Sequence, residues 1–404
     1  MKSTAFTPQE RITSISLAGV FSLRMFGMFV VLPVLSLYVG SFDQVDGLSV
    51  GFAIGIYGLT QAIFQVPFGR LSDSWGRKNT IYVGLIIFAV GSVIAALASN
   101  ALVLCLGRAV QGAGAISSVV IALNADLTRD VVRTKSMAII GIAIGITFMV
   151  SIVLGPLLGA LIGVRGIFIL TAVLTVFAGF VIRMYVPDPP AQIAASSLSR
   201  GLLSNVLKNS QLNRLNFGIF SLHGILMATF VVVPFQLRLL IDEPNTWAVY
   251  FFVMLASVLV MFPLMLLSER KGKSKEAFLI SICSIALACL VLYIFRTDLW
   301  VFGICLVLFF AGFNLLEATL PSLVSKIADA RSKGTALGVY SSSQYIGTFL
   351  GGATGGLILD AFGNKGVFLF CGLWAGIWIV IAVGSVFPGR EFPGDEASKE
   401  NTHR

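Results

Sequence analysis

The chain has 404 residues, of which 57% are hydrophobic and 12% are charged, and its formal net charge at pH 7 is +9. A soluble domain cannot hide that much apolar surface, so lipid must be the solvent for most of the chain. The composition therefore excludes a soluble domain, and the excess of Lys and Arg needs a cause other than nucleic-acid binding.

Apolar runs of roughly 20 residues or more recur from end to end, and each is long enough to cross a bilayer as an α-helix. The short alternating segments of a membrane strand barrel are not seen. The first run is also too long for the apolar region of a cleaved signal peptide. The pattern predicts an all-α membrane protein with twelve transmembrane helices, at about 12–40, 48–71, 79–98, 101–127, 134–163, 165–186, 213–241, 246–268, 275–295, 299–325, 332–361 and 365–387.

One polar stretch, Pro187 to Asn213, divides the chain near its middle. A faint repeat supports two related halves, because Arg133-Thr-Lys135-Ser and Arg331-Ser-Lys333-Gly each open a Gly-rich helix. We therefore expect two six-helix bundles with a substrate path between them. The expected domains are an N-terminal bundle at 1–187, a cytoplasmic linker at 188–212, a C-terminal bundle at 213–387 and a cytoplasmic tail at 388–404.

The Lys and Arg residues predict the orientation of the helices. With the amino terminus inside, 22 of the 28 basic residues fall in inner segments and only four fall in outer ones. Positive residues favour the cytoplasmic side of a membrane. This asymmetry predicts a multi-pass protein of the bacterial inner membrane with both termini in the cytoplasm, and it explains the basic charge without nucleic acid.

The sequence gives no support for a metal site, a cofactor site or a nucleotide-binding site. All five cysteines lie inside apolar runs and lack metal-ligand spacing. The nearest fragment of a phosphate-binding loop, Gly272-Lys273-Ser274, lacks the earlier glycine, because Leu267 stands there. The remaining possibilities are transport driven by an ion gradient and facilitated diffusion of the substrate down its own gradient.

The segment between the second and third helices reads Gly69-Arg70-Leu71-Ser72-Asp73-Ser74-Trp75-Gly76-Arg77-Lys78. Gly69 permits close backbone approach and Gly76 a tight turn, while Asp73 could face the positive amino end of another helix. Arg77 and Lys78 would hold the loop at the cytoplasmic surface. The segment resembles the signature loop of the major facilitator superfamily, in which the aspartate contacts helix 11 and favours the outward-open state.

Two further motifs strengthen this resemblance. Arg108-Ala-Val-Gln111-Gly112 is similar to the second motif of proton-coupled members, and Gly155-Pro156-Leu-Leu-Gly159 to the third motif of drug:proton antiporters, although Ser151 and Ala160 replace its usual glycines. The resemblance covers the whole chain. Within the superfamily it points to a YajR-like branch, through Phe21-Ser-Leu-Arg24-Met25 and Gly55-Ile-Tyr57-Gly58-Leu-Thr-Gln61.

Ionisable residues inside membrane helices are costly and usually functional. Arg24 cannot readily lose its proton, so it either holds an anion, a carbonyl or an acid, or extends to the cytoplasmic surface. Arg108 either adjusts the proton affinity of a neighbour, as the second motif implies, or bonds backbone carbonyls.

The second half carries the two embedded groups that titrate more readily. Glu317 is the only acid deep in an apolar run, where desolvation favours its protonated form. It either exchanges a proton or stays neutral, bonded to a polar neighbour such as Asn314. His223 either relays protons or packs as a neutral ring. Glu317, His223, Arg108 and Arg24 are thus the candidates for proton coupling.

Two further groups of residues are candidates for the transport machinery. We expect Asp126, at the inner end of the fourth helix, to pair with Arg77 and brace the signature loop. Polar or large side chains within the helices are candidates for the cavity lining, namely Phe21, Met25, Gln61, Gln111, Asn314, Tyr340 and Gln344.

Together these features favour proton-coupled export of small amphipathic or drug-like compounds by alternating access, from a monomer that binds a small-molecule substrate and protons in the bilayer. The first alternative is a major facilitator transporter of a polar or anionic metabolite held by Arg24 and Arg108. A membrane enzyme would need a cluster of catalytic groups, which the sequence lacks, so we expect no enzyme activity. A receptor without transport activity is disfavoured by the intact signature loop.

Overall fold

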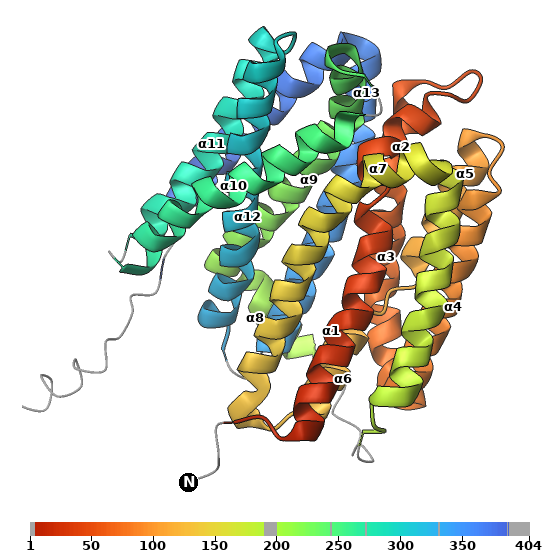
Figure 1. Ribbon diagram of the computed structural model, residues 1–404. Coiled ribbons are helices and arrows are strands. Elements are labelled where there is room, and N and C mark those ends of the chain that lie inside the picture. Colours follow the sequence, from red (N-terminus) through yellow and green to blue (C-terminus); the bar gives the residue numbers. More distant parts are fainter. Residues whose placement is uncertain are drawn as a thin grey trace, which may run out of the picture.

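The computed structural model describes residues 5–189, 200–242, 245–270, 273–329, 332–385 and 387. It is an α-helical bundle whose two halves lie side by side (Figure 1). The N half contains α1 (Pro8–Phe29), α2 (Leu32–Val39), α3 (Gly47–Trp75), α4 (Arg77–Ala96), α5 (Ala101–Ala113), α6 (Ser117–Asp126) and α7 (Asp130–Tyr185). The C half contains α9 (Ser210–Leu240), α10 (Thr246–Arg270), α11 (Ser274–Phe295), α12 (Leu299–Ile327) and α13 (Lys333–Val383), and α8 (Arg200–Lys208) precedes it.

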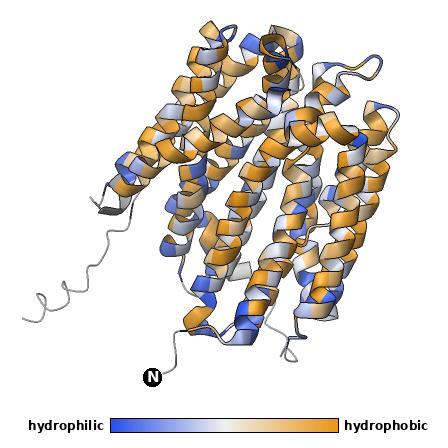
Figure 2. Ribbon diagram, in the orientation of Figure 1, coloured by the Kyte–Doolittle hydropathy of each residue, from blue (hydrophilic) through white to orange (hydrophobic). Residues whose placement is uncertain are grey.

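Within these residues, ten segments are long and apolar enough to span a membrane. Two of them, α7 and α13, each bend sharply at a glycine with positive φ, Gly163 (φ 70°) and Gly363 (φ 65°). Only glycine adopts this backbone conformation without strain, so each bend divides one segment into two crossings. The predicted twelve helices in two halves are confirmed, and hydrophobic residues predominate along most of the length of the helices (Figure 2).

Several predicted helix ends were wrong. The first helix begins at Pro8 rather than 12, because Thr7 and Glu10 form a capping box that starts it earlier. The predicted helix 101–127 is interrupted between Ala113 and Ser117, and the last helix ends at Val383 rather than 387. The linker expected at 188–212 carries α8, and α9 begins at Ser210.

The signature segment is almost entirely helical, which corrects the expected loop. The last turns of α3 run to Trp75, α4 starts at Arg77, and only Gly76 between them has non-helical dihedrals (φ 98°). One glycine is enough to reverse the chain, so the flanking polar residues remain in the helices. We call the surface that carries Arg77, Lys78, Arg129 and Arg133 the basic face, and the surface at the other end of the helices the opposite face.

The halves touch closely toward the opposite face. There α3 and α13 approach backbone to backbone, so that a Cβ added at Gly55 would lie 2.7 Å from the Phe349 carbonyl oxygen. Ser36 of α2 also donates to the Phe230 carbonyl of α9 at 2.6 Å.

Toward the basic face, α3 and α13 are further apart. A Cβ added at Gly69 of α3 would have only Ser118 of the N half within 4.0 Å, and one added at Gly334 or Gly338 of α13 would meet nothing within 4 Å. Within the described residues, α3 and α13 therefore pack backbone to backbone toward the opposite face, and their glycines nearer the basic face make no such contact.

Candidate functional site

Three polar side chains from three helices meet in the C half. His223 of α9 lies 3.8 Å from Glu317 of α12, measured from Nε2 to Oε2. The same His223 Nε2 is 2.8 Å from Nε2 of Gln344 on α13. Each of the three residues lies in the middle third of its membrane crossing. The structure therefore brings two of the four proton-coupling candidates together with one cavity candidate.

The surroundings of this cluster differ for its two ionisable members. The His223 side chain is 3% exposed, whereas the Glu317 side chain is 33% exposed. The Phe313 ring lies beside the imidazole, with 5.7 Å between ring centroids. Among the described residues, Glu317 Oε2 has no hydrogen-bond partner. A bond between Asn314 and Glu317, one alternative expected from the sequence, is not seen in the described part of the chain, where the Asn314 amide donates to Ser257 at 3.4 Å.

This arrangement suits a group that gains and loses a proton. An amide offers both a donor and an acceptor, so Gln344 can donate to a neutral His223 or, with its amide turned, accept from a protonated one. Glu317 is near enough to stabilise a charged imidazole. Burial disfavours a charged Glu317 or a charged His223 that lacks the other group as its counter-ion. The Tyr340 hydroxyl is buried and has no hydrogen-bond partner among the described residues.

Arg24 lies in the middle of the N half, and its side chain does not reach the cytoplasmic surface. Its guanidinium donates to Ser117 Oγ at 2.9 Å and to Gln61 Oε1, and the residue is 2% exposed. Gln61 in turn donates to Gln65 at 3.0 Å. Ser117 lies 3.3 Å from the hydroxyl of Tyr345 on α13, so this network extends to the C half.

Arg108 belongs to a second buried network that stays within the N half. It donates to Gln111 Oε1 at 2.8 Å and to the Ala53 carbonyl at 3.4 Å, and Gln111 donates to Ser92 at 2.8 Å. The guanidinium also lies 5.0 Å from the centre of the Tyr57 ring. Gln111 is fully buried here, among residues of its own half.

The signature residues form an ionic cluster on the basic face. Arg77 contacts Asp73 at 2.5 Å and Asp126 at 3.0 Å, which confirms the expected pair with Asp126. In this structure Asp73 faces Arg77 instead of a helix end. Lys78 contacts Asp188 at 2.9 Å and lowers the pKa of that carboxyl. The expected close approach at Gly69 is not seen, since its nearest neighbour is 4.0 Å away.

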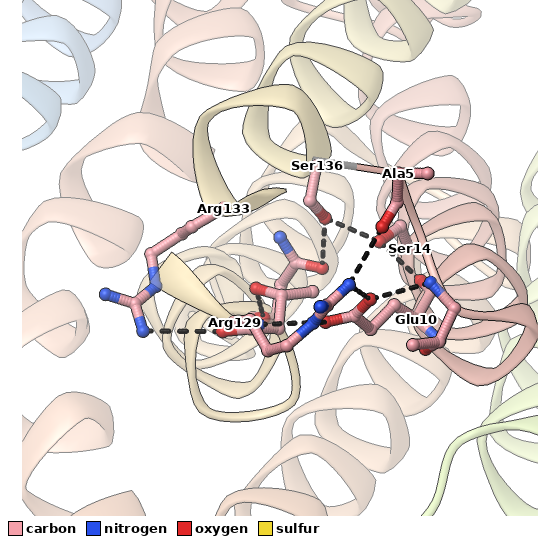
Figure 3. A network of polar contacts seen from close by, with 9 residues as sticks. Ala5, Glu10, Ser14, Arg129, Arg133 and Ser136 are labelled. Atoms are coloured by element: carbon pink, nitrogen blue, oxygen red, sulfur yellow. Dashed lines mark hydrogen bonds and ion pairs between the residues drawn. The ribbon is translucent and has the colours of Figure 1, made fainter. Parts of the chain in front are cut away.

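A further network on this face was not predicted from the sequence. Glu10 of α1 accepts from the Arg129 side chain at 2.8 and 2.9 Å and from its backbone N–H at 3.1 Å (Figure 3). The hydrogen bond to Glu10 raises the pKa of Arg129. Beside it, Ser136 contacts Ser14 at 2.6 Å and donates to Asn124 at 2.8 Å. The capping-box spacing of Thr7 and Glu10 indicates a helix start in the sequence, but it does not indicate Arg129 as a partner of Glu10.

The motif glycines serve close packing. A Cβ added at Gly112 would meet the Tyr57 carbonyl and the Thr60 hydroxyl. One added at Gly155, next to Pro156, would meet the Val30 carbonyl, and one at Gly159 would lie 3.1 Å from Val34. The third motif therefore packs against the break between α1 and α2.

The remaining cavity candidates do not gather in one place. Phe21 and Met25 are 5% and 6% exposed and belong to the apolar core. A hollow toward the basic face lies between α9 and α13 and is lined by Asn216, Phe217, Phe220, Ser343 and Ile346. In the described part of the chain, no group of three or more His, Cys, Asp or Glu could hold a metal ion.

Comparison with known proteins agrees with this architecture. The chain is 44% identical over 385 residues to the inner membrane transport protein YajR of Escherichia coli (strain K12), covering 95% of this chain and 85% of the relative. It is 24% identical over 371 residues to the quinolone resistance protein NorA of Staphylococcus aureus (strain COL), covering 89% and 93% of the two chains.

A solved structure shares the fold. This is a bacterial homolog of the human lysosomal transporter Spinster, in an inward-facing and occupied conformation, which matches with a TM-score of 0.75 at 13% identity over 94% of this chain and 97% of that one. The family model described as Major Facilitator Superfamily matches residues 17–352 and 245–403. The resemblance to this superfamily and to its YajR-like branch is confirmed, and the chain belongs to the Major Facilitator Superfamily of secondary transporters rather than to a family of enzymes.

Proposed function

We propose that the protein is a proton-coupled exporter of small amphipathic compounds that works by alternating access as a monomer in the bacterial inner membrane. The observation that carries the proposal is the cluster of His223, Glu317 and Gln344 inside the membrane region. In the described membrane helices this cluster joins an acid and a histidine, the two side chains best suited to bind and release protons near neutral pH.

The orientation of the bundle follows from its charges. The positive-inside rule would direct the basic face to the cytoplasm, so the proposal also assigns both ends of the chain to the cytoplasmic side. Because α3 and α13 are packed toward the opposite face and separated toward the basic face, the structure then corresponds to an inward-facing state. The separated ends would admit substrate from the cytoplasm, and closure there would accompany its release outside.

An aromatic contact between the halves supports an amphipathic substrate. Phe148 of α7 stacks on Phe313 of α12 with 5.2 Å between centroids, and Phe310 lies 6.3 Å from the same ring. Phe313 also lies beside His223. A compound with an apolar body and one polar group would fit next to these rings, and the relative NorA is named as a quinolone resistance protein.

Arg24 favours one alternative, a transporter of polar or anionic metabolites. Its guanidinium is buried between the neutral groups of Ser117 and Gln61, at a point where the N half contacts Tyr345 of the C half. Burial of a cation among neutral partners is costly, and a bound anion would offset that cost.

Transport by the purified protein in liposomes separates these functions. An imposed pH gradient should drive the amphipathic compounds ethidium and norfloxacin, with counter-movement of protons reported by an internal pH dye. The anionic alternative instead requires gradient-driven flux of a dicarboxylate such as succinate, abolished by Arg24→Gln. No gradient-driven flux of either class would overturn the leading proposal.

A further inference from the structure

A carboxylate from the C half caps the first turn of a helix in the N half. Asp360 lies at the opposite-face end of the first crossing of α13, shortly before its bend. Its Oδ1 accepts from the backbone N–H of Gly47 at 2.6 Å, and its Oδ2 accepts from that of Leu48 at 3.0 Å. Both N–H groups belong to the first turn of α3, so one residue spans the contact between the halves.

The first N–H groups of a helix lack partners within the helix and form its positive end. The helix's own cap, the Asp46 side chain, accepts from the Ser49 N–H at 2.9 Å. The Asp360 carboxylate accepts from two other backbone N–H groups of this turn. Hydrogen bonds to an ionised carboxylate are stronger than those between neutral groups. This is a favourable interaction that exists only while the α3 terminus and the end of the α13 crossing are together.

Glycines on both helices make the contact possible. A Cβ added at Gly47 would lie 2.7 Å from Asp360 Oδ1 and 2.8 Å from the Gly356 carbonyl oxygen. One added at Gly352 would lie 2.6 Å from the Gly51 carbonyl oxygen. The two backbones therefore touch along several turns, and this alignment holds the carboxylate against the helix terminus.

The other end of α3 carries the corresponding group. Asp73, two residues before the end of α3, faces Arg77 in this structure, while the first turns of α13 lie apart from α3. Each of the two crossings thus has a carboxylate near its carboxyl end, and among the described residues only Asp360 caps the amino end of the partner helix. Here the cap is made on the opposite face and not on the basic face.

We propose that Asp360 is a positioning residue for the transport cycle, which holds the opposite face closed by capping α3 and so favours the state seen here. The proposal rests on the alternating-access function proposed above, because only then must the α3–α13 contact open. Opening that face requires Asp360 to leave the α3 terminus, and the energy of the two hydrogen bonds adds to the cost of the transition.

Hydrogen exchange of the full-length protein in lipid nanodiscs, without substrate or a gradient, tests the proposal. Where reclosure is fast, the exchange rate of a protected amide is proportional to the population of the open state. In Asp360→Asn we expect roughly threefold to tenfold faster exchange in all opposite-face contact segments, 47–58, 230–236 and 345–360. Asp360→Glu, which keeps the carboxylate, should restore part of the protection.

Asp46→Ala is the matched control. It removes a cap from the same turn of α3, but Asp46 belongs to the N half, so faster exchange should be confined to the first turn of α3. If Asp360→Asn changes only that turn as well, Asp360 is a local cap and the proposal is wrong. Because this measurement needs neither substrate nor protons, a failure of the proposed transport function would not alter its outcome. Far-UV circular dichroism and gel filtration would confirm that each variant is folded.

Discussion

The two halves of the transporter share an architecture and differ in the charges that they bury. In the N half, Arg24 and Arg108 are 2% and 1% exposed, and their bonds go to amide, hydroxyl and carbonyl groups. In the C half, His223 and Glu317 lie 3.8 Å apart, and the acid is 33% exposed. In the middle of the membrane region, the N half thus holds groups of fixed charge, while the C half holds groups that can change their charge.

This difference indicates that the two halves of a duplicated fold can have different chemical roles. A guanidinium keeps its proton at any physiological pH, so the N half can bind, orient and pack but cannot itself exchange protons. A carboxyl and an imidazole in contact can share or lose a proton. On the proposed proton-coupled function, the groups that exchange protons would therefore lie in the C half, while the hydrogen bonds from Arg24 through Ser117 to Tyr345 connect the two halves.

Replacement of Glu317, the acid within the C half, should have the largest effect on transport. In Glu317→Gln we expect pH-gradient-driven accumulation to fall to the level of protein-free liposomes, because the neutral amide cannot release a proton. Exchange of labelled for unlabelled substrate, which needs no net proton movement, should persist. Flux assays of gradient-driven accumulation and of substrate exchange would measure the two activities separately.

The exposed acid Glu276 of the same half provides the control, and Glu276→Gln should behave as the unmodified protein. If Glu317→Gln still accumulates substrate against its gradient, the proton site lies elsewhere and the proposed division between the halves is incorrect.

The buried arginine that contacts only its own half should contribute to stability. Arg108→Ala would remove the partner of Gln111 Oε1, the contact with the Tyr57 ring and a large buried volume. We expect a loss of roughly 3 kcal/mol and a fall in Tm of roughly 5–10 °C in detergent, measured by the fluorescence of the native tryptophans. Arg183→Ala, at an exposed position of α7, should change Tm by a degree or less. Equal shifts for the two variants would contradict a stabilising role for Arg108.

The sequence allowed the prediction of those features that depend on composition along the chain. Membrane helices, their number and the two bundles follow from apolar length. The pair of Arg77 and Asp126 could be expected because two short connections on one face bring their helix ends together. The interruption between Ala113 and Ser117 was missed, although Gly112 and Gly114 close to it indicate a weak point in the helix.

Features that depend on how helices face one another could not be predicted. His223, Glu317 and Gln344 lie on three helices, and their contact depends on the rotation of each helix about its axis. Tyr345 and Ser117 are neutral residues that resemble many others in the chain. Asp360 lies near a predicted helix end, and nothing local in the sequence indicates that its partner is the first turn of α3 in the other half.

Reversal of a charge in the basic-face cluster should have the smallest effect, because the cluster is partly solvated. Asp126 is 27% exposed and contacts Arg77, which also contacts Asp73. In Asp126→Arg we expect transport to fall by a factor of about two to five, since an exposed pair contributes only about 0.5–1 kcal/mol and the reversed charge repels Arg77. The double variant Arg77→Asp with Asp126→Arg should recover part of the loss, although Asp73 then faces a like charge.

Asp130 offers a comparison in the same connection, because its side chain is 88% exposed and pairs with Arg133 within one helix turn. Asp130→Arg should leave transport within about twofold of the unmodified protein, since a solvated pair within one helix contributes little. If the double swap at 77 and 126 recovers nothing while both proteins are folded, the pair does not act as a unit. Asp73, the other acid that contacts Arg77, would then be the next residue of the cluster to test for an effect on transport.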